Sequence, residues 1–171
     1  MSDHVEGNSP RVLVVDIDGV VADVRHRLHH LEGGSRDWEA FFAAMGLDPV
    51  LAQGQALVDE ARAEGHRIVY LTGRPERWRT DTVTWLAAHG LEGDDLFMRP
   101  DADRRPARVF KVEVLRRLAT SAEIIALVDD DPDVLAAVAA TGVATRLAEW
   151  MPRSDPLRDP LRDAQERLGR T

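Results

Sequence analysis

Two acidic residues, with one residue between them, end the most hydrophobic stretch of the chain. Asp16 and Asp18 come directly after the run VLVV of residues 12–15. Two carboxylates this close repel each other when both are ionised, so a chain that keeps them gains something in return. A carboxylate can attack as a nucleophile, transfer a proton or bind a hard metal ion. This pair is therefore the first candidate for an active site.

A second acidic group follows another apolar stretch nearer the end of the chain. Asp129, Asp130 and Asp133 are its candidate functional members, whereas Asp131 precedes Pro132 and fits the N-cap of a helix. Carboxylates gathered from both groups cannot all ionise cheaply without a cation. Mg²⁺ prefers oxygen ligands from one or two carboxylates, waters and a substrate phosphate. We therefore expect Mg²⁺ as the cofactor, with the metal residues Asp16, Asp18, Asp129 and Asp130.

Two further elements could hold a phosphate group. Thr72, Gly73 and Arg74 lie on a strand-to-helix turn, where a hydroxyl can donate, a glycine lets the backbone approach, and an arginine adds a forked donor. The plainer interpretation is a threonine that ends a strand and a glycine that forms a turn. Lys111 lies on a predicted amphipathic helix and could hold phosphate oxygens, although a lone helical lysine is usually a solvated surface group.

The elements that must position these residues alternate between strands and helices. Continuous β-branched runs predict buried strands, and apolar residues at helical spacing predict helices. This alternation predicts a doubly wound α/β fold with a parallel sheet covered on both faces, and such sheets bind ligands beyond the carboxyl ends of their strands. The predicted strands are residues 12–17, 67–72, 95–98, 123–130 and 143–147, and the predicted helices are 38–45, 49–64, a helix from Pro75 to Gly90, 109–119 and 132–140.

Composition limits the class of protein. The chain has 171 residues, of which 44% are hydrophobic and 30% charged, with a net charge of −8 and no cysteine. No apolar run reaches the roughly 18 residues of a membrane span, and the acidic balance argues against binding along a nucleic-acid duplex. We expect a cytoplasmic protein with no membrane partner and no disulfide partner. Residues 1–10 are expected to form a flexible leader, 11–150 one domain, and 151–171 a charged tail.

The motif order over residues 11–148 resembles the haloacid dehalogenase (HAD) superfamily of phosphotransferases. The sequence Asp16-Ile17-Asp18-Gly19-Val20 is followed by Thr72, then Lys111, then the pair Asp129-Asp130. The resemblance implies a Rossmann-like fold, Asp16 as the nucleophile, Asp18 as the general acid and base, and Lys111 as a further catalytic residue. Receiver domains of response regulators use similar residues, but their acidic pair comes early and their lysine last, whereas Lys111 precedes the acidic pair.

The resemblance narrows further within the superfamily. Residues 25–50 leave room for a loop and a helix, so the cap is expected to be small or absent, which suits bulky or polymeric substrates. The segments HRLHHL, DWEAFF, EGHRIVYLTGRPERWR and RRPARVFK resemble the phosphatase domain of phage-type polynucleotide kinase-phosphatases, which removes 3′-phosphates from nucleic acid ends. The chain has no GxxxxGK(S/T) motif for the kinase half. The resemblance implies a Mg²⁺-dependent 3′-phosphatase-like enzyme that acts through an aspartyl-phosphate on a phosphomonoester, at a nucleic acid 3′-end or on a nucleotide.

Two alternatives to a 3′-phosphatase stay open. The same fold could serve a small-molecule phosphatase or nucleotidase, which the acidic surface favours. It could also serve a non-catalytic domain that binds phosphate or a partner, although the intact set of motifs speaks against this.

Other polar and aromatic residues have no assigned role at this point. His26, His29 and His30 fit a polar face over the mouth of the site better than a metal site. Trp38 and Trp78 could stack bases but fit the core or its rim better. Four arginines could contact phosphates or form a solvated face: Arg99, Arg104, Arg105 and Arg108.

Overall fold

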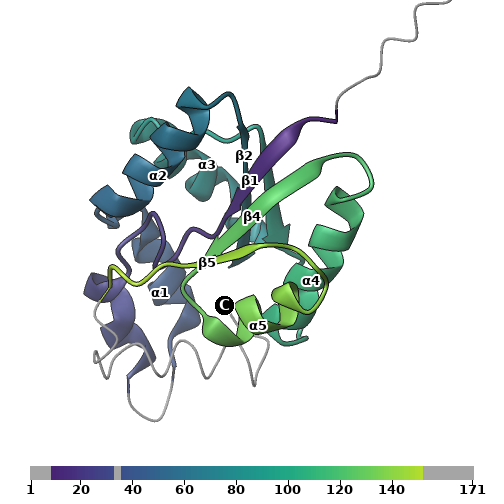
Figure 1. Ribbon diagram of the computed structural model, residues 1–171. Helices are drawn as coiled ribbons and strands as arrows, with labels where there is room; N and C mark the ends of the chain where they lie inside the picture. The colour runs from purple at the N-terminus through teal and green to yellow at the C-terminus, as the bar shows by residue number, and fades with distance from the viewer. Residues whose placement is uncertain (1–8, 33–35, 152–171) are drawn as a thin grey trace, which may run out of the picture.

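Five parallel strands form the central sheet of the computed structural model, which describes residues 9–32 and 36–151 (Figure 1). β1 (Arg11–Val15) lies at the centre, between β2 (Arg67–Pro75) and β4 (Glu123–Asp129). β3 (Asp95–Arg99) and β5 (Thr145–Leu147) form the two edges, so the order is β3-β2-β1-β4-β5. Every neighbouring pair is parallel. The predicted α/β fold with a parallel central sheet is confirmed.

Helices cover both faces of the sheet (Figure 1). α2 (Ala52–Ala63) and α3 (Arg79–Ala88) pack on one face, and α4 (Ala107–Leu118) and α5 (Pro132–Ala139) pack on the other. Connections between parallel strands cross over in one hand, and helices on both faces result when the chain winds outward from the central strand in two directions. This arrangement is the doubly wound one.

The central strand contributes side chains to both cores. Leu13 and Val15 pack with α2 and α3, whereas Val12 and Val14 pack with α4 and α5. Successive side chains of a strand point to opposite faces, so a strand with helices above and below must be apolar at every position. This requirement explains the unbroken run VLVV that precedes Asp16.

Two helix starts differ from the sequence prediction. Pro75 was expected to open a helix, but it is the last residue of β2, with φ −64° and ψ 145°, and it pairs with Arg99. A short 3-10 turn, η3 (Glu76–Trp78), follows, and α3 begins only at Arg79. The helix predicted from residue 49 begins at Ala52, because Val50 bridges to Ala22 and is held in an extended conformation.

A small cap segment, residues 24–48, lies between β1 and α2. It contains two 3-10 helices, η1 (Arg25–Leu31) and η2 (Ala44–Leu47), and one short helix, α1 (Trp38–Ala43). These elements enclose an aromatic core of their own, built on Val24, Leu28, Leu31, Phe41, Phe42 and Met45. The loop and helix expected in place of a large cap domain are therefore present.

Backbone hydrogen bonds join the two ends of the cap segment. The amide of Asp23 donates to the carbonyl of Pro49 at 2.8 Å, and the amide of Leu51 donates to the carbonyl of Val21 at 2.9 Å. The cap segment therefore begins and ends at one point, which we call the stem, residues 21–23 and 49–51.

The predicted leader and tail lie almost wholly outside the described residues. Of residues 1–10 the structure describes only Ser9 and Pro10, and of residues 151–171 only Met151. Within the described ranges, no helix has the length and apolar character that crossing a membrane requires.

Gly54 allows α2 to lie against the loop that follows Asp18. A Cβ at this position would lie 1.9 Å from the backbone oxygen of Val20, which is closer than any real contact. We expect Gly54→Ala to lower the free energy of unfolding by about 1–3 kcal/mol through overpacking, outweighing the roughly 1 kcal/mol that alanine gains in a helix.

Chemical denaturation would measure this effect. Gly46→Ala is the matched control, because nothing lies within 4 Å of a Cβ there. We expect the control to stay within about 0.5 kcal/mol of the wild type. Equal stability of the Gly54 and Gly46 variants would contradict this account of the close approach.

Candidate active site

The carboxyl edge of the sheet brings the predicted residues together, and nearly all of them are buried. Asp16 and Asp18 follow β1, Thr72 lies near the end of β2, and Asp129 ends β4. Lys111 reaches the same place from α4 with 3% of its surface exposed. Lysine and aspartate are rarely buried unless they are paired, so the partners of these side chains decide what the site can do. The contacts divide into two groups, centred on Asp16 and on Asp18.

Gly19 shapes the loop that carries both aspartates. It has φ 80°, a left-handed conformation that side-chain-bearing residues rarely adopt. The turn that it permits lets the amides of Val20, Val21 and Ala22 donate to the carbonyl of Ile17. The glycine of the sequence motif is thus explained by backbone geometry.

Lys111 joins the first group together. Its Nζ lies 2.9 Å from Oδ2 of Asp16 and 2.7 Å from Oδ2 of Asp129. The remaining oxygens of the two aspartates accept backbone amides: Oδ1 of Asp16 from Ile17 at 2.8 Å, and Oδ1 of Asp129 from Asp131 at 2.9 Å. Both carboxylates are therefore fixed in orientation. Lys111 is not the solvated lysine that helical position alone would favour.

Burial dominates the electrostatics of Asp16. It raises the pKa of Asp16 to about 7, with Lys111 opposing the rise and the carboxylates of Asp129 and Asp18 adding to it. For Lys111, burial favours the neutral form, but Asp129 and Asp16 outweigh it and the pKa lies above its usual value. The ammonium is thus charged, and one positive charge is too little for the carboxylates around it.

The donor set near Lys111 fits a hard divalent cation. Asp16, Asp129 and Asp130 each offer one carboxylate oxygen, and these atoms lie within 4.8 Å of one another. No other group of three acidic or histidine ligands occurs among the described residues. Oxygen-only donors of this kind suit Mg²⁺ rather than zinc or copper. Asp131 is instead the N-cap of α5, as predicted, and accepts from the amide of Asp133.

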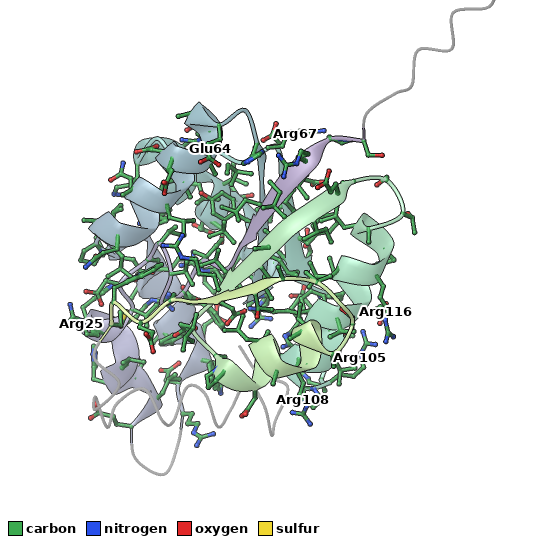
Figure 2. All side chains as sticks on the ribbon, in the orientation of Figure 1. Arg25, Glu64, Arg67, Arg105, Arg108 and Arg116 are labelled. Carbon is green, nitrogen blue, oxygen red and sulfur yellow. The ribbon has the colours of Figure 1, made fainter. Side chains whose placement is uncertain are left out.

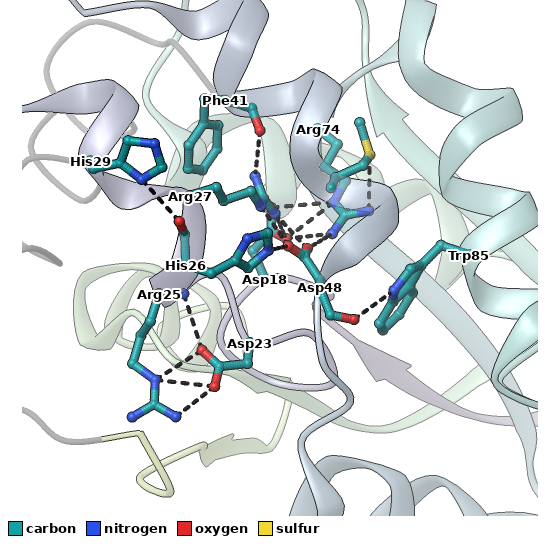
Figure 3. Close-up of polar contacts among 11 residues, drawn as sticks. Asp18, Asp23, Arg25, His26, Arg27, His29, Phe41, Asp48, Arg74 and Trp85 are labelled. Carbon is teal, nitrogen blue, oxygen red and sulfur yellow. Dashed lines mark hydrogen bonds and ion pairs between the residues drawn. The ribbon is translucent and has the colours of Figure 1, made fainter.

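The second group surrounds Asp18 with two arginines (Figure 3). Arg27 Nη2 lies 2.8 Å from Oδ1 of Asp18, and Arg74 Nη2 lies 2.6 Å from the same oxygen. Asp48 completes the group: its Oδ2 accepts from Arg27 at 2.8 Å and from Arg74 at 3.1 Å. Burial would raise the pKa of Asp18, but Arg74 and Arg27 outweigh it and lower the pKa to about 2. The Asp18 carboxylate is therefore ionised, and it is not part of the donor set of Asp16, Asp129 and Asp130, so a metal contact of Asp18 stays a prediction.

Two of the predicted phosphate-binding residues have intramolecular contacts. Both guanidinium Nη atoms and Nε of Arg74 are engaged, with Asp18, Asp48, Met45 and Thr82, and none of its surface is exposed. A direct contact of Arg74 with phosphate stays a prediction, and it would require these bonds to be exchanged. The hydroxyl oxygen of Thr72 accepts from the amide of Arg74 at 3.2 Å, which leaves its proton free to donate. Gly73 is buried beside them.

Sequence reasoning missed Arg27 and Asp48. Arg27 lies in the histidine-rich stretch that was assigned to a polar face, and Asp48 precedes a proline in a predicted loop. No local pattern marks either residue as buried, because their burial depends on how the cap segment folds back onto the sheet. The only signal is their charge: an arginine and an aspartate in a short segment between two strands.

The other polar and aromatic candidates have mainly structural contacts. His26 Nε2 lies 2.7 Å from Oδ1 of Asp48, and His29 bonds the carbonyl of His26, so the histidines form no metal site in the described ranges. Trp38 and Trp78 pack at the rim of the aromatic core of the cap segment. Arg99 is buried over the ring of Phe110. Arg105 pairs with Asp103 and Glu113, and it lies with Arg108 on the outside of the molecule near α4, where Arg104 is exposed (Figure 2).

The buried arginines are expected to matter for stability. Arg27→Ala would leave two buried carboxylates, Asp18 and Asp48, to share Arg74, and breaking a buried ion pair costs about 3–5 kcal/mol. Arg11→Ala is the matched control, because Arg11 pairs with Glu123 at the surface and such pairs contribute at most about 1 kcal/mol. Urea denaturation of both variants measures the difference. Losses of similar size in the two would show that the buried group is no more important than a surface pair.

Comparisons with known proteins agree with this geometry. Residues 10–146 match the family described as the polynucleotide kinase PNKP phosphatase domain. No curated protein gives a significant match. Among solved structures, the Pnkp1/Rnl/Hen1 complex contains a chain with a TM-score of 0.70 and 20% identity, which matches over 82% of this chain and 45% of its own length. This chain thus spans less than half of that relative.

Two bacterial structures share the fold at lower identity. A class C acid phosphatase from Bacillus anthracis has a TM-score of 0.60 and 15% identity, over 74% of this chain and 53% of the other. A putative β-phosphoglucomutase from Thermotoga maritima has a TM-score of 0.61 and 11% identity, over 88% and 91%. These likenesses concern the fold, while the family match covers most of the sequence. The chain therefore belongs to the family of polynucleotide kinase phosphatase domains, and it is a phosphatase domain of the HAD type.

Proposed function

We propose that this domain is a Mg²⁺-dependent phosphomonoester hydrolase that works through an aspartyl-phosphate on Asp16. The observation that carries the proposal is the separation of two carboxylates into different environments. Asp16 faces Lys111 and two acidic residues, whereas Asp18 is held ionised by two arginines. Burial raises the pKa of Asp16, but a cation held by Asp16, Asp129 and Asp130 would favour its ionised form, which is the nucleophilic one.

In the proposed reaction, Asp16 attacks phosphorus and Asp18 transfers protons. An oxygen of Asp16 forms a bond to phosphorus while the bond from phosphorus to the leaving oxygen breaks, and Asp18 gives its proton to that oxygen. The water oxygen then forms a bond to phosphorus while the bond from phosphorus to the Asp16 oxygen breaks, and Asp18 takes a proton from that water, which restores its protonated form. The ionised Asp18 of the described structure corresponds to the second half of the cycle. The negative charge of an arriving phosphate favours its protonation for the first half.

The remaining site residues hold the phosphoryl group and balance its charge. Lys111 and the hydroxyl of Thr72 are placed to donate to the non-bridging oxygens, with Gly73 allowing the backbone to approach. Asp16, Asp129 and Asp130 would hold Mg²⁺ together with the main-chain carbonyl of Asp18. When bound, Mg²⁺ would neutralise the carboxylates and polarise the phosphoryl oxygen.

The proposed substrate is the 3′-phosphate of a nucleic acid end. The family match supports this choice, since its description names a polynucleotide kinase phosphatase domain. The small cap segment supports it too, because a site without a large cap admits the end of a polymer. A relative with this fold is part of an RNA repair complex. The net charge of −8 favours the second candidate, a nucleotidase acting on small substrates.

Phosphate release from three classes of substrate tests the function. We expect a 3′-phosphorylated oligonucleotide to be hydrolysed with a higher kcat/KM than mononucleotides or an aryl phosphate, and only with Mg²⁺ present. Asp16→Asn is expected to fold normally and to lose turnover by roughly a thousandfold or more, since an amide oxygen is a poor nucleophile.

The outcomes separate the candidates. If mononucleotides are the preferred substrates, the domain is a nucleotidase rather than a 3′-end phosphatase. Turnover retained by Asp16→Asn would exclude the aspartyl-phosphate on Asp16. No release by the wild type from any of the three would favour a domain that only binds phosphate.

Metal binding can be measured without turnover. We expect Mg²⁺ to bind the wild type in isothermal titration, and Asp130→Asn to weaken the affinity at least about tenfold, because one of three anionic ligands is lost. Asp101→Asn is the matched control, an exposed aspartate that pairs with Arg77 away from the donor set. Equal affinity in the Asp130 variant and the wild type would remove Asp130 from the metal site.

A further inference from the structure

We propose that Asp48 and Arg27 are positioning residues for proton transfer: with Arg74 they form a buried clamp that fixes the orientation of the Asp18 carboxylate. This inference rests on the proposed role of Asp18 as general acid and base. It extends the active site to the cap segment, which supplies two of the three clamp residues. The clamp is defined as Arg27, Asp48 and Arg74.

The contacts around Asp18 are directional. Arg74 approaches Asp18 with two nitrogens, Nε at 3.1 Å and Nη2 at 2.6 Å from Oδ1. Arg27 adds Nη2 at 2.8 Å to the same oxygen. Planar guanidinium groups impose a fixed geometry on a carboxylate, unlike the point charge of a lysine. Oδ1 is therefore held by both arginines, while Oδ2 has only the 3.3 Å contact with Nε of Arg74 and is the oxygen left for proton transfer.

Asp48 holds the two arginines in register with each other. Its Oδ1 accepts from Nε of Arg27 at 2.8 Å, and its Oδ2 accepts from Nη2 of both arginines. Its side chain is completely buried, so it cannot touch a substrate. Its backbone carbonyl accepts from Nε1 of Trp85, which anchors the residue to α3 (Figure 3). Apart from His26, whose Nε2 lies 2.7 Å from Oδ1, the side-chain partners of Asp48 are the two arginines, and through them Asp48 acts on Asp18.

Stability alone is a weak reason for such a clamp. Burying two arginines and two carboxylates costs several kcal/mol per ion in desolvation, and apolar residues of similar volume often serve a core equally well. What the four charges provide, and apolar residues would not, is a carboxylate held in one orientation. A misplacement of about 1 Å in a reacting group can cost roughly a hundredfold in rate.

Leaving-group dependence tests the clamp directly. A series of aryl phosphates, from 2,4-dinitrophenyl to phenyl phosphate, differs mainly in how much the leaving oxygen needs a proton. We expect Asp48→Asn to lower kcat/KM for phenyl phosphate by roughly ten- to a hundredfold and for dinitrophenyl phosphate by less than about threefold. The ratio of the two values does not depend on the fraction of protein that is folded.

Three further variants sharpen the test. Asp18→Asn removes the proposed general acid, so it gives the largest change expected in the ratio of kcat/KM between dinitrophenyl and phenyl phosphate. Arg27→Lys keeps the charge but not the planar geometry, and we expect it to change this ratio in the same direction as Asp48→Asn. Asp23→Asn is the matched control, because Asp23 binds Arg25 and has no contact with Asp18. We expect its ratio to equal that of the wild type.

The outcomes distinguish this proposal from the proposed function. A steeper leaving-group dependence in both clamp variants supports the clamp. A uniform loss across the series, or no loss, overturns it while leaving the phosphatase assignment intact. Absence of phosphate release by the wild type from every substrate, the 3′-phosphorylated oligonucleotide included, overturns both together.

Discussion

Repulsion between carboxylates at the carboxyl edge of the sheet is the constraint on which this site depends. Four buried aspartates meet there, Asp16, Asp18, Asp48 and Asp129, and three buried cations stand among them: Lys111, Arg27 and Arg74. The cations are unevenly shared. Two arginines pair with Asp18 and Asp48, whereas a single lysine pairs with Asp16 and Asp129, and Asp130 lies close by. The excess negative charge is thus concentrated where a divalent cation and a phosphoryl group would be bound.

The sheet makes this uneven sharing possible. Parallel strands end at the same edge, so residues far apart in the sequence arrive within hydrogen-bonding distance without long loops. The rigid core beneath them fixes their backbones: Val12, Val14 and Val15 are almost completely buried on the two faces of β1. Burial of apolar surface in this core stabilises the fold and offsets the repulsion between the carboxylates. This stabilisation does not depend on whether the site is occupied.

Much of this arrangement could be predicted from the sequence. The run VLVV is typical of a strand that is buried on both faces. The aspartates that follow such a strand must then lie at the carboxyl edge of the sheet. Lys111 was predictable only as a member of an ordered set of motifs, since its own helix gives no reason for burial. The start of α3 was misplaced because Pro75 suits both the first turn of a helix and an extended strand end, and pairing with Arg99 decides between them. Arg27 and Asp48 could not be placed, because their partners are set by tertiary contacts of the cap segment rather than by any local pattern.

The stem holds the two ends of the cap segment together. The segment's two ends are fastened by backbone bonds between residues 21–23 and 49–51, and Arg27 and Asp48 both lie close to that fastening. For a flexible loop that is closed at its base, each doubling of length costs only about 0.6 kcal/mol. Because Phe41 and Met45 contact the clamp arginines from within the segment, a change of length is tolerated best where the chain makes no contact with the clamp, as at the exposed Glu32.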